Sequence, residues 1–174
     1  INRRKFLEYF GCSCCSLALS SCTTVPITER RQLSIIPEAR INQQAATAYE
    51  KFKSKTKLIT SGKQLREIID IGKKIENSVT AFFDQQGKED PTKNFGWDYI
   101  LVDNDKMINA WCMPGGKIAV YTGLLKISQN TDALSIVMGH EIAHAVARHS
   151  VERMSQAMTI NLGTTVADIF LGGA

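Results

Sequence analysis

The pentapeptide His140-Glu141-Ile142-Ala143-His144 combines two imidazoles that can bind a metal with a carboxylate that can act as a base. An α-helix advances by about 100° per residue, so His140 and His144 lie on one side, a turn apart, and can reach the same ion. Glu141 then lies beside that ion. A carboxylate there can take a proton from zinc-bound water, whose pKa falls to about 7, and pass it to a departing amide nitrogen. The pattern predicts one Zn²⁺ per subunit and hydrolysis of peptide bonds.

The residues around the pentapeptide predict that it lies on a helix. Asn130, followed by Thr131 and Asp132, can cap the start of that helix. Apolar residues recur through the segment at helical spacing, namely Leu134, Val137, Met138, Ile142, Ala145 and Val146. A chance match on an ordinary amphipathic helix is the alternative, but we expect one in well under about one in a hundred chains of this size. We therefore interpret the pentapeptide as a zinc site.

Hydrophobic periodicity predicts the elements that must hold this site. Two stretches, residues 38 to 54 and 63 to 85, have apolar residues at the spacing of a helix. The spacing then changes to that of strands in three short pieces, residues 97 to 103, 108 to 113 and 117 to 122. The helices are expected to form the core and to carry no chemistry of their own. The last two strands are also expected to contribute to substrate binding.

Two further helical pieces flank the expected zinc helix. Residues 124 to 127 can form a helical turn before it, and residues 150 to 171 continue as helix, with a break near Gly163. The polar residues of the 158 to 171 stretch argue against a transmembrane span.

Composition places limits on what the chain can be. A length of 174 residues with 44% hydrophobic residues suits one globular domain plus appended segments. The net charge of +4 is modest and comes partly from Arg3, Arg4 and Lys5, so we predict no nucleic-acid-binding surface. All cysteines except Cys112 lie within the first 22 residues, which is no disulfide framework.

The N-terminus is typical of an export signal. Basic residues precede a short apolar stretch, and Arg3-Arg4 resembles a twin-arginine signal. Leu19-Ser20-Ser21-Cys22 resembles a bacterial lipobox, which predicts lipidation at Cys22 and a membrane-anchored periplasmic lipoprotein. Thr23, at the position after the cysteine, favours the outer membrane. A signal peptide cleaved without lipidation, or a weak membrane anchor, remains the alternative.

The expected organisation has three parts. Residues 1–21 form the export signal, residues 22–37 an extended tether, and residues 38–174 the N-terminal portion of a metallopeptidase domain. The tether assignment rests on the breakers Pro26 and Pro37 and on the absence of a clear period between them.

With these motifs in place, the chain resembles family forty-eight of the metallopeptidases, which includes HtpX-like and BepA-like proteases, and within it the periplasmic lipoprotein branch. The resemblance covers roughly residues 22 to 158. It rests on two runs and one shorter segment, which are Asn109-Ala110-Trp111-Cys112-Met113-Pro114-Gly115-Gly116, the pentapeptide with Ala145-Val146-Ala147-Arg148-His149, and Thr28-Glu29-Arg30-Arg31-Gln32-Leu33.

The resemblance implies an endopeptidase of the gluzincin type, with an α+β, mostly helical zincin fold and a small sheet beside the active-site helix. The segment 118–121 can then act as an edge strand that holds a substrate peptide extended across the metal. Gly115 and Gly116 would let the backbone approach closely and reverse direction. The alternative for this segment is a plain hairpin turn, which is compatible with a substrate edge. The expected substrate-binding residues are Asn109, Gly115, Gly116, Ile118 and Val120.

The third zinc ligand is the main departure from the family. Family members supply a glutamate from a later helix, which this sequence does not reach before Ala174, so we expect a fragment truncated at both ends. Two histidines alone would leave the zinc short of the three protein ligands of a catalytic site. His149 would point about 180° from His140 on a continuous helix, and Glu152 would lie about 18 Å along it, so neither is expected as a ligand. Asp168 could fold back to the metal but fits a packing helix equally well.

Two functions of different class follow from these features. The first is a zinc endopeptidase, anchored to the membrane by its N-terminal lipid, that cuts unfolded or misassembled envelope proteins. That class of substrate is implied by the resemblance and by export. The alternative is a non-catalytic, chaperone-like binding lipoprotein that keeps the protease fold. An intact Glu141 favours the enzyme.

Overall fold

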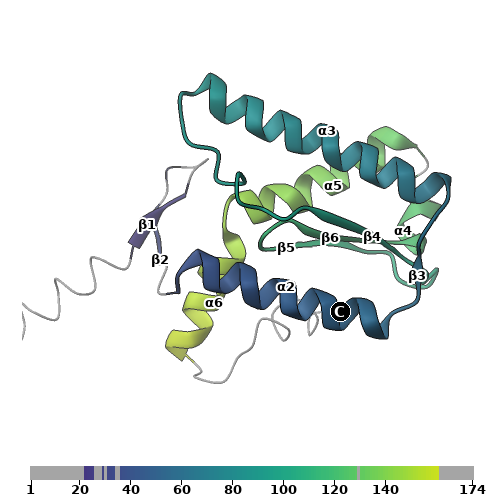
Figure 1. Cartoon of the computed structure of the whole chain (residues 1–174), viewed down its shortest axis with the longest axis horizontal. Helices are drawn as coiled ribbons and strands as arrows, with labels where there is room; N and C mark the ends of the chain where they lie inside the picture. The colour runs from purple at the N-terminus through teal and green to yellow at the C-terminus, as the bar shows by residue number, and fades with distance from the viewer. Residues whose placement is uncertain (1–21, 26–28, 30, 34–35, 129, 161–174) are drawn as a thin grey trace, which may run out of the picture.

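A four-stranded sheet lies between two layers of helices (Figure 1). Helices α3 and α5 cover one face of the sheet, and α2 and α6 pack on the other. The predicted α+β, mostly helical fold is therefore confirmed. The computed structural model describes residues 22–25, 29, 31–33, 36–128 and 130–160.

The helices form where apolar residues recur with helical spacing. The expected helices 38 to 54 and 63 to 85 agree with α2 and α3, and the expected turn at 124 to 127 is α4. The described helices are α2 (Glu38–Lys55), α3 (Lys63–Gln85), α4 (Thr122–Ile127), α5 (Thr131–Val146) and α6 (His149–Ile160). The predicted break near Gly163 lies outside the described residues.

The sheet is mixed, in the order β3-β4-β6-β5. Its strands are β3 (Leu58–Ile59), β4 (Asp98–Val102), β5 (Ala110–Met113) and β6 (Lys117–Tyr121). Strands β4 and β6 pair in parallel, whereas β3 pairs with β4, and β5 with β6, in antiparallel fashion. The three predicted strands are confirmed, and β3 was not predicted.

Strand β6 lies inside the sheet and not at its edge. Ile118 pairs with Tyr99 of β4 on one side and with Cys112 of β5 on the other. The expectation that 118–121 is an edge strand is therefore wrong, because both of its backbone edges are already occupied. Among the described strands, β5 is the outer one on this side of the sheet.

Successive side chains along each strand point to opposite faces of the sheet, and both faces are apolar. In β5, Cys112 points to the core beside α3 and α5, whereas Trp111 points to the core beside α2. In β6, Val120 and Ala119 divide in the same way. Because helices cover both faces, the strands have few polar positions.

The stretch expected as a tether, residues 22–37, is described only in part. Two short strands, β1 (Cys22–Thr24) and β2 (Arg31–Leu33), pair in antiparallel fashion. Val25 is fully buried, and α6 contacts β2, so this part of the segment is extended but packed against the domain. The domain boundaries themselves stay a prediction.

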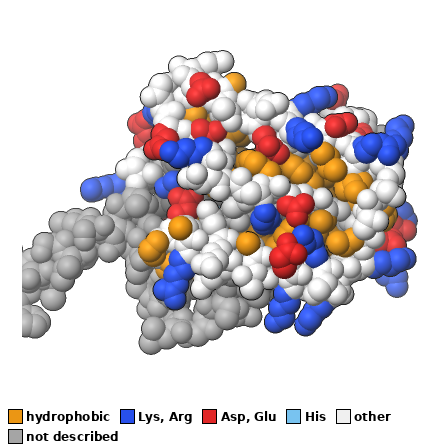
Figure 2. Space-filling view, viewed as in Figure 1, with side chains coloured by type: hydrophobic (Ala, Val, Ile, Leu, Met, Phe, Trp, Pro, Cys, Tyr) orange, Lys and Arg blue, Asp and Glu red, His pale blue; other side chains and the backbone are white. Residues whose placement is uncertain are grey.

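The surface is mixed in charge. Figure 2 shows Lys and Arg interspersed with Asp and Glu, and hydrophobic side chains gathered in a band across the middle of the face. Within the described part of the chain, no helix is both long enough and apolar enough to cross a membrane.

Candidate zinc site

Helix α5 holds the pentapeptide, as predicted. The Asn130 side chain accepts a hydrogen bond of 2.8 Å from the backbone N–H of Ala133, which caps the start of the helix. Leu134, Met138 and Ile142 are buried in the core shared with α3. The apolar face of α5 thus points into the domain, and His140 and His144 keep part of their surface exposed.

The two histidines converge on one point. The Nε2 atoms of His140 and His144 lie 3.0 Å apart, and the rings are edge to face, with centroids 4.5 Å apart. Two nitrogens on a tetrahedral zinc, each at 2.0–2.1 Å, would lie about 3.3 Å from each other. The donor set and its spacing therefore fit two of the ligands that a zinc ion requires.

Glu141 is partly withdrawn from solvent. It is half-buried, and this burial raises its pKa above the ordinary value, although the nearby charges of His140 and Arg153 oppose the shift. Its charge in turn helps to raise the pKa of the Cys112 thiol, behind the larger effect of burial. Glu141 therefore lies near β5, the outer strand on which α5 packs.

The helix ends just after the pentapeptide, where the sequence predicted that it would continue. Helix α5 stops at Val146, and Arg148 has a φ of 56°, in the left-handed region that costs a residue other than glycine about 1–2 kcal/mol. An ion pair of 2.8 Å between Arg148 and Glu38 of α2 anchors this junction. The chain then starts a new helix, α6, at His149.

This break corrects the expected positions of His149 and Glu152. Both expectations assumed one continuous helix, and that assumption is wrong. The Nδ1 atom of His149 lies 2.6 Å from Nδ1 of His144, so the two rings are in contact. Glu152 lines a cavity of about 350 Å³ together with His144 and His149. The expectation that Glu152 lies too far along the helix to reach the site therefore no longer holds.

The third ligand stays a prediction. Among the residues that the structure describes, no group of three or more His, Cys, Asp or Glu side chains is arranged to hold a metal ion. His140 and His144 would supply two ligands, and His149 contacts the nitrogen of His144 that faces away from His140. Asp168 lies outside the described residues.

The structure corrects two of the expected substrate-binding residues and explains two others by a turn. Ile118 and Val120 are buried in the core beside α3 and α5, within a strand that is paired on both sides, so neither offers a free backbone edge to a peptide. Gly115 and Gly116 form the β5–β6 hairpin turn with φ of 77° and 76°, which explains both glycines. A substrate role for Asn109, which precedes β5, stays a prediction.

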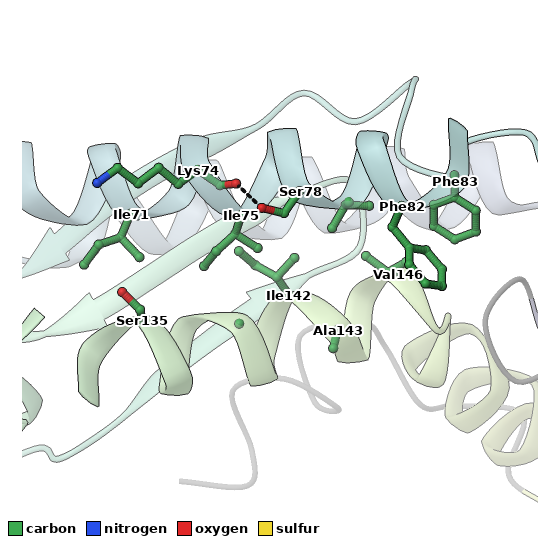
Figure 3. A pocket seen from close by; sticks show the side chains of 12 residues that line it. Ile71, Lys74, Ile75, Ser78, Phe82, Phe83, Ser135, Ile142, Ala143 and Val146 are labelled. Carbon is green, nitrogen blue, oxygen red and sulfur yellow. Dashed lines mark hydrogen bonds between the residues drawn. The ribbon is translucent and has the colours of Figure 1, made fainter. Parts of the chain in front are cut away.

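Sequence reasoning missed an apolar groove behind the zinc helix. It has a volume of about 440 Å³ and lies between α3 and α5 (Figure 3). Ile75 and Phe82 line it from α3, and Ile142 and Val146 from α5. Gly139 of α5 also lines it, and a Cβ atom at this position would meet nothing within 4 Å.

A zinc-binding motif on a helix, packed beside a small mixed sheet, defines the class of zincin-like metallopeptidase domains. Residues 73–173 match the sequence profile of Peptidase family M48, which is more than half of the chain. The chain therefore belongs to this family.

Several proteases are similar to the chain over part of their length. Mitochondrial metalloendopeptidase OMA1 of Arabidopsis thaliana is 38% identical over 79 residues, which is 45% of this chain and 15% of the relative. The protein of the same name in Saccharomyces cerevisiae is 32% identical over 95 residues, 51% of this chain and 28% of the relative. Beta-barrel assembly-enhancing protease of Escherichia coli K12 is 38% identical over 56 residues, 32% of this chain and 11% of the relative. The matches thus span less than a third of each relative.

Proposed function

We propose that this chain carries the zinc-binding part of a zinc-dependent endopeptidase, with Glu141 as the base. The observation that carries the proposal is the convergence of the His140 and His144 Nε2 atoms at 3.0 Å on the helix that also bears Glu141. Homology to the metalloendopeptidases of family M48 supports it. Zinc, when bound, polarises the peptide carbonyl and lowers the pKa of a coordinated water.

The chain's own residues would supply the proton transfers. Glu141 takes a proton from the attacking water and passes it to the amide nitrogen as the peptide bond breaks. Burial raises the pKa of Glu141, which makes its carboxylate a stronger base and favours removal of the proton from water. His140 and His144 hold the metal on the exposed side of α5.

The substrate peptide would lie along β5 rather than β6. Strand β5 is the outer strand beside α5, so an extended peptide can add to its backbone edge. Cys112 lies near the middle of β5, and the charge of Glu141 contributes, after burial, to the raised pKa of its thiol. A peptide at this edge would therefore lie near the base.

Digestion of an unfolded protein tests the proposal. Zinc-loaded protein is expected to cleave casein, and His140→Ala and His144→Ala are expected to lose both zinc and cleavage. Cleavage by the two variants at the wild-type rate would contradict the proposal.

A non-catalytic binding protein is the second candidate. It is favoured by the absence, within the described ranges, of a three-ligand metal cluster. Such a protein would suppress the aggregation of an unfolded client without cutting it, and Glu141→Gln would leave that effect unchanged. The endopeptidase would instead produce fragments, and only with Glu141 intact.

For localisation and substrates, we propose an exported lipoprotein that acts on misassembled envelope proteins. The lipobox ending at Cys22 supports export, and the name of the Escherichia coli relative refers to β-barrel assembly. Other relatives are mitochondrial by name, so the compartment rests on the N-terminal sequence. Cys22→Ser is expected to move the protein from membranes to the soluble periplasmic fraction, and unchanged membrane association would contradict lipidation.

A further inference from the structure

The two ring nitrogens of His144 face two different histidines. Its Nε2 lies 3.0 Å from Nε2 of His140, on the side where the metal would bind. Its Nδ1 lies 2.6 Å from Nδ1 of His149, and the two rings have centroids 4.9 Å apart. A neutral imidazole has one protonated nitrogen and one lone-pair nitrogen, so a partner at Nδ1 decides what Nε2 can do.

We propose that His149 is a positioning residue for the zinc ligand His144. In this arrangement Nδ1–H of His144 donates to Nδ1 of His149, which leaves the lone pair of His144 on Nε2. The same bond fixes the plane of the His144 ring, so that Nε2 points to the position that Nε2 of His140 also faces. The inference rests on the proposed zinc site and adds a residue outside the pentapeptide to it.

The fold places His149 in this position through the break between α5 and α6. The left-handed Arg148 turns the chain back, so that the residue after it reaches the ring of His144. The Arg148–Glu38 ion pair holds the turn from outside. Strained backbone persists where the surrounding structure fixes it, and such sites gather near functional groups.

Packing on the other side of the sheet holds α6 in place. Helix α5 is buried in the core with α3, whereas Val151 and Met154 of α6 are buried in the core with α2. His149 lies at the first position of α6, between these two anchored helices, and is itself only half-buried. The two anchored helices therefore fix the position of His149, which does not lie on a surface loop.

The test compares wild type with His149→Ala and His149→Asn. The asparagine carbonyl can accept the bond from His144 where Nδ1 of His149 does, whereas alanine cannot. Zinc affinity is measured by competition with a chromophoric chelator. We expect zinc binding to weaken by about 10–100-fold in the alanine variant and to return close to the wild-type value in the asparagine variant.

Nitrogen-15 NMR of the metal-free protein at pH 8.5 tests the hydrogen bond without zinc. We expect His144 to carry its proton on Nδ1 in wild type and in His149→Asn, and to populate both tautomers in His149→Ala. Thermal unfolding of the metal-free proteins shows whether each variant still folds. A variant that has lost its fold would also show altered tautomer signals.

Two outcomes would overturn the inference. One is a wild-type zinc affinity and an unchanged His144 tautomer in His149→Ala. The other is an equal loss of zinc in both variants while the His144 tautomer stays on Nδ1, which would make His149 a ligand. If wild type binds no zinc while the NMR result holds, the proposed function fails but the hydrogen bond stands.

Discussion

Tyr99 of β4 lies against the backbone of Gly72 on α3, so closely that a Cβ atom on Gly72 would be 2.1 Å from the tyrosine ring. The Tyr99 hydroxyl donates a hydrogen bond to Glu76, one turn further along α3. This contact sets the distance between α3 and the sheet, and α5 packs against both α3 and β5. The helix that carries the zinc motif therefore depends on a glycine far from the motif.

Replacing Gly72 with alanine is expected to destabilise the domain, although alanine normally favours a helix. Overpacking against Tyr99 should cost about 1–3 kcal/mol of unfolding free energy. Gly139→Ala is the matched control, because a Cβ atom at that position would have no neighbour within 4 Å. That variant should gain about 0.5–1 kcal/mol. Urea denaturation measures both, and equal stabilisation by the two substitutions would contradict the contact.

Glu141→Gln is expected to lose proteolysis and to keep zinc. The amide cannot accept the proton from water, while both imidazoles remain in place on α5. We expect a fall in kcat of about 10²–10⁴-fold. Casein digestion gives the rate and a metal assay gives the zinc content. A variant with bound zinc and a wild-type rate would show that another group is the base.

Metal removal is expected to abolish proteolysis reversibly. A zinc chelator such as 1,10-phenanthroline should stop casein digestion, and added zinc should restore it in wild type. The same addition should not restore Glu141→Gln, which separates loss of the base from loss of the metal. Activity that survives complete chelation would rule out metal-assisted hydrolysis.

Cys112 is expected to be unreactive in the folded protein. Burial raises the pKa of its thiol well above the ordinary value, with a further contribution from Glu141, so little thiolate forms at pH 8. Alkylation by iodoacetamide should be at least roughly tenfold slower in native protein than in urea. Peptide mass mapping separates Cys112 from the N-terminal cysteines, and Cys112→Ser identifies its peptide. Fast native labelling would contradict the burial of this thiol in β5.

Sequence periodicity predicted the parts of the fold in which burial decides the pattern. Helix α3 was expected at residues 63 to 85 and is found there, because its apolar positions repeat over several turns. Strand β3 was missed because two residues are too short to show a period. The interior position of β6 was also missed, since alternation reports which face is buried and not which strand is the neighbour.

The candidate site was predicted where its residues are adjacent in sequence. His140, Glu141 and His144 share one helix, so helical geometry alone brings the histidines together. The contact between His144 and His149 depends on a left-handed Arg148, which replaces the glycine that usually marks such a helix end. No residue type in that stretch indicates the break, which is why a continuous helix was expected.

An anomalous difference map at the zinc edge, from crystals of zinc-loaded protein, tests the central claim most directly. We predict a single strong peak about 2.0–2.1 Å from the Nε2 atoms of both His140 and His144, with Nδ1 of His144 facing His149. A zinc peak bound elsewhere, or no peak between these two histidines at saturating zinc, would contradict the assignment of this site.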